Sequence, residues 1–311
     1  MWTEGFTGAC YNPLVIQLRD YQLDLIDRVR KSMQSGNRRV LMQLPTGGGK
    51  CLGFDTPVLM YDGTVKPVQD VQVGDLLMGD DSTPRTVLSL ARGREEMYRI
   101  KPTKGEVWEV NKSHILSLVS NDKGRDDYNQ VVDVELRDYL GLSAYRRHTL
   151  KQFSVAVDWP EKPLPFDPYF LGLWLGDGTS ATTAITTMDE EVVDEIRAQA
   201  GAFGLSVRVI DLPNNKSSEY HLTSGAKRDN PILKILQSIG VINNKHIPLD
   251  YLANSRENRL ALLAGIIDTD GYVHNNSLEI AQKSAALADN IALLARSLGL
   301  RALVSDKVVN G

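Results

Sequence analysis

The feature that most constrains this chain is a glycine-rich loop that breaks off one residue before its expected end. Residues 44–51 read Leu-Pro-Thr-Gly-Gly-Gly-Lys-Cys. A phosphate-binding loop needs glycines that let the backbone wrap the phosphates, a lysine that reaches them, and then a Ser or Thr hydroxyl for Mg²⁺. Lys50 is present, but Cys51 stands in place of the hydroxyl and opens a segment of different character. The sequence therefore predicts that one protein is inserted into another at this loop.

Composition limits the classes to which the chain can belong. Its 311 residues leave room for two or three domains. The formal net charge of −4 argues against a protein that binds nucleic acids non-specifically through a high positive charge. Two cysteines, Cys10 and Cys51, do not make a disulfide framework, which favours a reducing, cytoplasmic setting. No apolar run approaches the ~20 residues of a membrane span, and the N-terminus lacks the pattern of a secretory signal.

The chain divides into three segments that differ in residue composition and in predicted secondary structure. Residues 1–50 predict a short α/β fragment, in which a helix after Asp20 and a strand at 40–42 lead into the glycine loop. Residues 51–160 are rich in Val, Thr and Gly-Asp turns, which predicts a small all-β unit with strands at 57–60, 76–78, 107–110 and 115–119. A proline-rich linker follows. Residues 165–311 alternate helices with strands, as an α+β domain does.

The third segment contains an internal repeat. Apolar helical stretches at 171–178 and 264–271 both end in Asp-Gly, and each precedes a further helix, at 192–203 or 287–298. Strands are expected at 207–209 and 302–304, and a helix near 232–239 closes the first copy. The second copy stops at Asn310-Gly311, a hairpin signal with no returning strand, so we expect the chain to be truncated there.

Residues 17–22, Gln-Leu-Arg-Asp-Tyr-Gln, and the loop at 44–50 resemble superfamily 2 helicases. The resemblance covers only residues 1–50. It implies that the spliced host would bind ATP through the loop residues Thr46, Gly47, Gly48, Gly49 and Lys50. The alternative interpretation is a flexible glycine linker after a surface helix.

Residues 51–59, the Asp62-Gly63 turn and residues 73–81 resemble the opening of inteins, which have the Hedgehog/intein (Hint) fold. Asn111-Lys112-Ser113-His114 resembles the Asn/Thr-x-x-His element, with Asn first as in inteins of the vacuolar-ATPase type. The resemblance implies that Cys51 attacks the Lys50 carbonyl, Asn111 orients the strained bond, and His114 protonates the departing nitrogen, with no cofactor. A small buried cysteine and a structural histidine are the alternatives.

The repeated motifs resemble LAGLIDADG homing endonucleases. Gly172 and Gly176 are four residues apart and share one helix face, and Gly265 and Thr269 hold the matching positions. Small residues there let two helix backbones approach closely. A single such motif would indicate only a buried helix with a capped end, whereas two copies predict a paired endonuclease core.

This packing is expected to bring Asp177 and Asp270 together at the helix ends. The resemblance implies that the two carboxylates hold Mg²⁺ against a scissile phosphate and activate water. Lys245 matches a Lys-x-Ile-Pro element that supplies a catalytic lysine, with a solvated loop lysine as the alternative. Asp268 is a weaker candidate ligand, because Leu175 holds its place in the first copy.

Double-stranded DNA is the expected partner, bound by a monomer with two pseudo-symmetric repeats. Residues 165–311 carry 17 acids and 13 bases, so any DNA surface must be local. An acidic cluster at 189–195 reads as a solvated helix start. A basic run, Arg146, Arg147, His148 and Lys151, is either a DNA contact or a charged sheet edge. Candidate phosphate contacts lie on or beside strands: Arg208, Lys216, Lys227, Arg228, Lys283 and Arg301.

The sequence therefore predicts a multidomain chain. A helicase fragment (1–50) precedes the all-β Hint domain (51–160), and a truncated α+β LAGLIDADG endonuclease (165–311) follows. The predicted functions are protein self-splicing and site-specific DNA cleavage, carried by a segment that interrupts an ATP-dependent helicase. A free-standing LAGLIDADG endonuclease with a degenerate β module is the main alternative; a working helicase and a natural split intein half are the others.

Overall fold

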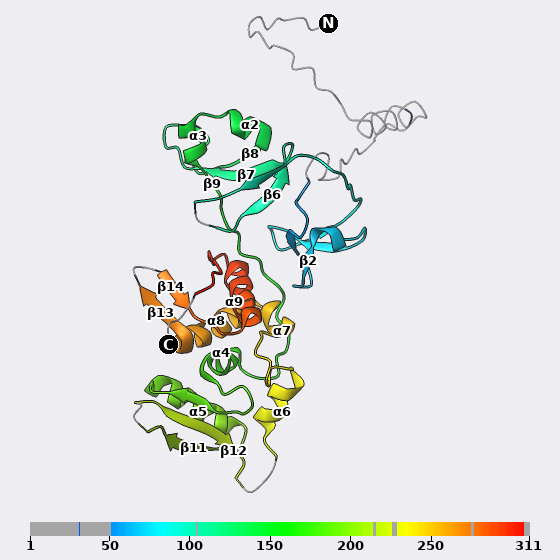
Figure 1. Cartoon of the computed structure of the whole chain (residues 1–311). Coiled ribbons are helices and arrows are strands. Elements are labelled where there is room, and N and C mark those ends of the chain that lie inside the picture. The colour runs from blue at the N-terminus through cyan, green and yellow to red at the C-terminus, as the bar shows by residue number, and fades with distance from the viewer. Residues whose placement is uncertain are drawn as a thin grey trace, which may run out of the picture. The chain divides into compact units, whose positions relative to one another are not determined.

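The computed structural model describes residue 31 and residues 51–103, 105–213, 216–225, 229–274 and 277–307. Contacts divide the chain into two compact units, Met1–Lys50 and Cys51–Gly311. The second unit is the one described below and is drawn in colour in Figure 1. The helix, strand and glycine loop predicted for residues 1–50 lie outside the described residues.

Short antiparallel strands dominate the first part of this unit. They are β1 (Pro57–Leu59), β2 (Val65–Pro67), β3 (Leu76–Met78), β4 (Pro84–Thr86), β5 (Met97–Ile100), β6 (Trp108–Asn111), β7 (Ile115–Ser120), β8 (Val131–Glu135) and β9 (Leu150–Lys151). The pairings β1–β2, β3–β4, β5–β6 and β8–β7–β9 build the sheets. A 3₁₀ turn, η1 (Val68–Asp70), follows β2.

The predicted hairpin at Asp62-Gly63 joins β1 to β2. Gly63 adopts φ +92°, a left-handed backbone that favours glycine, and the Asp62 carboxylate accepts a hydrogen bond from the Thr64 amide at 2.9 Å. A Cβ on Gly63 would also lie 2.3 Å from the Cβ of Ala253. The turn therefore requires glycine both for its backbone conformation and for its close packing.

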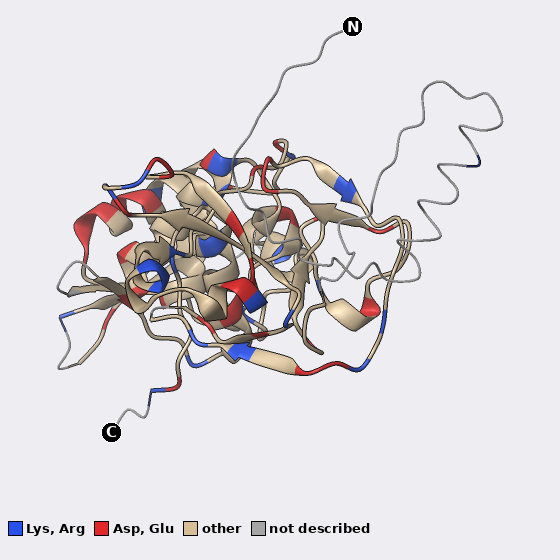
Figure 2. Ribbon diagram, turned by 90° about the horizontal axis from the view of Figure 1, so that it is seen from above, with Lys and Arg blue, Asp and Glu red and all other residues tan. Residues whose placement is uncertain are grey.

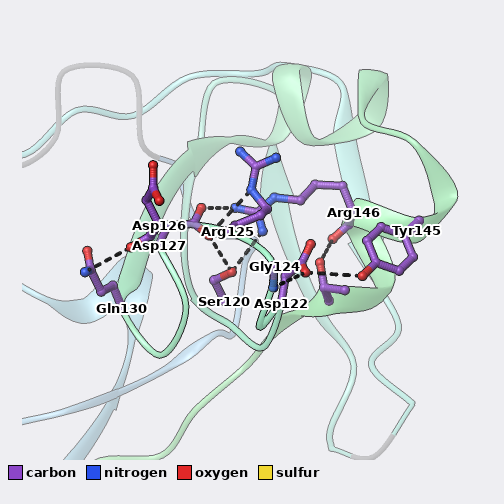
Figure 3. A network of polar contacts seen from close by, with 10 residues as sticks. Ser120, Asp122, Gly124, Arg125, Asp126, Asp127, Gln130, Tyr145 and Arg146 are labelled. Carbon is purple, nitrogen blue, oxygen red and sulfur yellow. Dashed lines mark hydrogen bonds and ion pairs between the residues drawn. The ribbon is translucent and has the colours of Figure 1, made fainter.

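Two short helices between β8 and β9, α2 (Leu136–Gly141) and α3 (Ala144–Thr149), make the all-β description of residues 51–160 too simple. Ser143 starts α3, because its hydroxyl accepts from the Arg146 amide at 3.2 Å. The Arg146 side chain, 13% exposed, binds the Ser120 hydroxyl and the Asp127 carboxylate in the polar network of Figure 3. Arg146 therefore supports the fold rather than a charged sheet edge.

The second part of the unit has the predicted alternation of helices and strands. Its elements are α4 (Pro168–Asp177), β10 (Ile185–Thr187), α5 (Glu190–Ala202), β11 (Ser206–Asp211), β12 (Ser218–Thr223), α6 (Pro231–Ser238), α7 (Leu249–Leu252), α8 (Arg256–Asp270), β13 (Gly271–His274), β14 (Ser277–Ile280) and α9 (Ala285–Ser297). The strands form an antiparallel sheet in the order β10–β12–β11 and a separate β13–β14 hairpin.

Helices α4 and α8 form the centre of one large apolar core. Trp174, Phe170 and Leu173 on α4 are fully buried, as are Leu262 and Ile266 on α8. The helices that follow each repeat cover this centre, because Ile196 of α5 and Leu294 of α9 belong to the same cluster. The two repeats therefore share one core. The C-terminal ends of their central helices lie together, because Gly176 packs against Thr269 and Asp270.

A buried arginine fixes the segment that leads into this core. The Arg259 side chain is fully buried and donates to the Asn254 carbonyl, the Ser297 hydroxyl and the Val157 carbonyl at 2.9, 2.7 and 2.6 Å. Its guanidinium also lies 4.9 Å from the centre of the Trp159 ring. These contacts satisfy a charge that would otherwise be costly to bury.

The strand predicted at residues 302–304 is not found in the structure. Residues 302–304 lie in no described strand, because a strand needs a hydrogen-bonded neighbour and none of the described strands pairs with them. Among the described helices, none is both long and apolar enough to cross a bilayer.

Candidate functional site

Cys51 is held along the edge of β6. The Asn111 amide donates to the Cys51 carbonyl at 3.2 Å and the Gly53 amide donates to the Glu109 carbonyl at 2.7 Å, with an antiparallel bridge between Leu52 and Val110. This short ladder fixes the backbone on the C-terminal side of the Lys50–Cys51 peptide bond. The partly exposed Cys51 therefore starts the unit in a defined conformation.

The Asn111 side chain binds the nitrogen of that peptide bond directly. Its Oδ1 accepts a hydrogen bond from the Cys51 amide at 3.1 Å, and Asn111 is completely buried at the end of β6. Its Nδ2 donates to Glu95 Oε2 at 2.7 Å and to Ser113 Oγ at 3.0 Å. The predicted pair of Cys51 and Asn111, sixty residues apart, is thus brought into contact.

His114 follows in the turn between β6 and β7. Its amide donates to the Asn111 carbonyl at 3.1 Å, and its carbonyl accepts from the Leu136 amide at 2.8 Å. The imidazole lies edge-on to the Trp108 ring, with the ring centres 5.7 Å apart. It faces a cavity of about 540 Å³. The ring is therefore held just after β6, in the lining of this cavity.

Asp177 and Asp270 occupy matching places at the last residues of α4 and α8. The two helices meet through small residues, as the spacing predicts. A Cβ on Gly172 would lie 2.3 Å from the Leu262 carbonyl, and one on Gly176 would lie 2.0 Å from Thr269 Oγ1 and 3.3 Å from Asp270 Oδ2. The Asp270 carboxylate therefore lies directly beside the end of α4.

The proximity of the two carboxylates is reflected in their protonation. Burial, and after it repulsion from Asp270, raises the pKa of Asp177 to about 6, while Lys245 opposes the shift. Burial also raises the pKa of Asp270, while Lys245 and a hydrogen bond from Gln282 act in the opposite direction. Two half-buried carboxylates therefore lie close together, an arrangement in which a bound cation would stabilise their ionised forms.

Lys245 reaches the end of α4 rather than solvent. Its Nζ donates to the carbonyls of Leu175 and Gly176 at 2.9 and 2.8 Å, where a helix C-terminus favours positive charge, and lies 5.5 Å from the centre of the Trp174 ring. Burial lowers its pKa, whereas Asp270 and Asp177 oppose this shift. Lys245 is thus placed beside both carboxylates.

Asp268 has a different partner. Its Oδ2 accepts a hydrogen bond from the Tyr169 hydroxyl at 2.8 Å, which helps to raise the pKa of that tyrosine after burial, the larger cause. The structure therefore associates Asp268 with the first turn of α4 and not with the carboxylate pair at its last turn.

Gln282 was not singled out in the sequence. Its side-chain amide donates to the Asp270 carboxylate. Gly271 pairs with Ile280 in the β13–β14 hairpin, so a residue just past Ile280 returns to the end of α8. The observed register of the hairpin places Gln282 there, whereas its residue type alone gives no signal in the sequence.

The donor set at the two helix ends fits Mg²⁺. Within the part of the chain that the structure describes, no three His, Cys, Asp or Glu side chains gather as a closed metal cage. Mg²⁺ commonly binds through one or two carboxylates and completes its shell with waters and substrate phosphates. A pair of facing carboxylates meets that requirement. The predicted ATP-binding residues 46–50 lie outside the described residues.

The candidate DNA contacts are only partly placed. Arg208 is exposed on β11, and Lys216, Lys283 and Arg301 are exposed as well. Lys227 and Arg228 lie outside the described residues. The acidic cluster starts α5, where the Asp189 carboxylate accepts from the Glu191 amide at 2.9 Å. Figure 2 shows charges of both signs spread over the ribbon.

Comparison with protein families gives two matches. Residues 51–139 match the family of Hint domains associated with homing endonucleases, and residues 246–310 match the homing endonuclease family. The first match begins at Cys51 itself, and it counts against a free-standing endonuclease with a degenerate β module.

The chain is also similar to parts of three curated relatives. The chain is 31% identical over 294 residues to "Replicative DNA helicase DnaB" of Mycobacterium intracellulare, covering 88% of this chain and 46% of the relative. It is 28% identical over 164 residues to "Homothallic switching endonuclease" of Saccharomyces cerevisiae, covering 45% and 28%. It is 41% identical over 51 residues to the catalytic subunit of the V-type proton ATPase of Candida tropicalis, covering 16% and 5%. The chain thus spans less than half the length of these relatives.

Residues of both candidate sites fall within the two different family matches. Cys51, Asn111 and His114 lie in the Hint match, and Asp270 and Gln282 lie in the endonuclease match. The chain therefore contains a Hint domain from Cys51 onward and a homing endonuclease domain in its C-terminal part, which is the composition of an intein that carries a homing endonuclease.

Proposed function

We propose that this chain splices itself out of a host protein and that its endonuclease domain makes a double-strand break at a specific DNA site. The hydrogen bond from the Cys51 amide to Asn111 Oδ1 is the observation that carries the splicing proposal. It holds the nitrogen of the peptide bond that the first step of splicing must break.

The first step transfers the acyl group of Lys50 from nitrogen to sulfur. Cys51 Sγ, having lost its proton, attacks the Lys50 carbonyl carbon. The C–N bond then breaks, a thioester forms, and the nitrogen of Cys51 takes up a proton and leaves as an amine. Asn111 holds that nitrogen, and His114 supplies its proton. Lys50 itself lies outside the described residues.

Replacing His114 by alanine should slow this step about 100-fold, because general acids contribute on that order or more. The step is measured by adding hydroxylamine, which cleaves a thioester, and following release of residues 1–50 on gels. His148→Ala, which removes an exposed histidine of α3, is the matched control and should cleave like the parent chain. Equal rates in His114→Ala and the parent would remove His114 from the mechanism.

The endonuclease proposal depends on the paired carboxylates at the ends of α4 and α8. Mg²⁺, when bound there, would stabilise charge on the scissile phosphate and lower the pKa of water. Asp177 and Asp270 would hold the ion, and Lys245 would place a positive charge beside them. We further propose that one chain supplies both halves of the site, as a monomer with two pseudo-symmetric repeats.

The exposed β11 strand and the β13–β14 hairpin are the proposed DNA surfaces. Arg208 offers a phosphate contact, while Tyr272 and Val273 are 64% and 71% exposed and offer apolar contacts to bases. The test is linearisation of a plasmid that carries the uninterrupted host gene, with Mg²⁺ or with a chelator. A plasmid carrying the interrupted gene is the control.

The proposed host is an ATP-dependent helicase. The likeness to the Mycobacterium intracellulare helicase supports a helicase host. The superfamily 2 assignment and ATP binding by residues 46–50 stay predictions from the sequence. Restoration of a Ser or Thr hydroxyl after Lys50 on splicing would complete the loop's Mg²⁺ ligand.

A further inference from the structure

Behind the contact between Cys51 and Asn111 lies a carboxylate to which neither the sequence motifs nor the family matches assign a role. Glu95 precedes β5, and its Oε2 accepts a hydrogen bond from Asn111 Nδ2 at 2.7 Å. On the other side of the same carboxamide, Oδ1 accepts from the Cys51 amide at 3.1 Å. Glu95, Asn111 and the scissile nitrogen are therefore joined in one line of hydrogen bonds.

The position of Glu95 follows from the register of β5 and β6. Met97 pairs with Asn111 in this antiparallel sheet. If the ladder continued by two residues, Glu95 would lie opposite Ser113. Side chains two residues apart in an extended strand project to the same face. Glu95 and Asn111 are thus diagonal neighbours, which explains their contact across sixteen positions of sequence.

Glu95 determines which end of the Asn111 carboxamide faces Cys51. The two ends of an amide have similar shapes but opposite hydrogen-bonding roles, and a flipped Asn111 would point its NH₂ at the Cys51 N–H. Ser113 Oγ, 3.0 Å from Nδ2, can donate or accept and so cannot enforce one orientation alone. An ionised carboxylate only accepts, and it therefore requires NH₂ on its own side.

The charge of Glu95 also acts during the reaction. As the Cys51 nitrogen leaves, it gains a proton and positive charge, so its hydrogen bond to Oδ1 becomes charge-assisted and stronger. A negative charge on the far side of the carboxamide makes Oδ1 a better acceptor through the polarised amide. This stabilisation grows toward the transition state, which is the condition for faster chemistry.

We infer that Glu95 is a positioning residue for the acyl shift at Cys51, acting through Asn111. The inference rests on the proposed splicing function. Glu95 is exposed, so solvent screens the electrostatic effect of its charge on Asn111. We therefore expect it to contribute about tenfold to the rate, less than a proton donor does.

The experiment measures the rate of hydroxylamine cleavage after Lys50 in the full chain. Glu95→Ala should slow cleavage about tenfold. Glu95→Gln keeps an oxygen that can accept a hydrogen bond from Asn111 Nδ2 but loses the charge. Its cleavage rate should lie between those of the parent chain and Glu95→Ala. Glu96→Ala is the matched control, because the neighbouring Glu96 accepts from the Tyr98 hydroxyl at 3.1 Å instead. Its rate should equal that of the parent chain.

The same change made in an Asn111→Ala chain separates positioning from a general effect on folding. If Glu95 acts through Asn111, Glu95→Ala should cause no further slowing there, whereas a structural defect would slow both backgrounds equally. An unchanged rate for Glu95→Ala in the parent chain, or equal slowing in both backgrounds, would overturn the inference. No cleavage in the parent chain itself would instead refute the proposed splicing function.

Discussion

Asp177→Asn and Asp270→Asn should each abolish DNA cleavage, with a loss on the order of a thousandfold or more. Each change keeps the shape of the side chain but removes one of the two facing negative charges at the ends of α4 and α8. The expected cation would then lose a charged ligand at the point where phosphate charge must be neutralised. Linearisation of a supercoiled plasmid bearing the uninterrupted host gene measures the effect.

Asp268→Asn is the matched control for this prediction. Asp268 lies two residues before Asp270 on the same helix, but its carboxylate accepts from the Tyr169 hydroxyl. We expect Asp268→Asn to keep most of the cleavage activity. In both active-site variants the thioester at Cys51 should still form, because that chemistry uses other residues. Cleavage by Asp177→Asn at the parent rate would contradict the assignment of the pair.

Gly265→Ala should unfold the endonuclease core or weaken it by about 3 kcal/mol. A Cβ on Gly265 would lie 2.1 Å from the Tyr169 carbonyl and 2.9 Å from the Leu173 amide, both backbone atoms that no rotamer change can move. Alanine gains about 1 kcal/mol of helix propensity over glycine, which the clash outweighs. Urea denaturation of the full chain, followed by tryptophan fluorescence, measures the change.

Gly201→Ala provides the opposite expectation in the same domain. Gly201 lies in α5, and nothing lies within 4 Å of a Cβ built there. Alanine should therefore stabilise by up to about 1 kcal/mol through helix propensity and the less flexible unfolded chain. Equal urea midpoints for Gly265→Ala and the parent would show that α4 and α8 do not pack through their glycines.

The helix pairing was predictable because its signal lies in residue type and spacing. Glycines four apart mark one face of a helix, and an aspartate at the end of each copy must then approach its counterpart. The roles of Cys51 and Asn111 were expected only from the resemblance of their motifs to inteins, and the structure brings the two residues into contact.

Other features depend on contacts that a linear pattern does not encode. Asp268 was only a weak candidate ligand by position, and the partner that holds it, Tyr169, lies ninety-nine residues away. Arg146 belonged to a run that looked solvent-facing, and it is instead a support for a loop. Glu95 and Gln282 carry no motif. Each is placed by strand register, which becomes known only when the pairing partners are known.

Lys245 shows how far a motif can be interpreted. Its Lys-x-Ile-Pro context left a catalytic and a solvated interpretation open. The structure places its ammonium on the carbonyls that end α4, beside both carboxylates. That location agrees with the catalytic interpretation, while the chemical role of the lysine stays a prediction.

The measurement that most directly tests the central claim is mass spectrometry of the full chain after treatment with hydroxylamine at neutral pH. If Cys51 forms a thioester with Lys50, a new N-terminal fragment should appear whose mass is that of residues 1–50 ending in a hydroxamate. The same fragment should be absent from Cys51→Ala, which keeps the backbone contacts to β6 but lacks the sulfur. Equal amounts of the fragment in both chains, or none from the parent, would contradict the account.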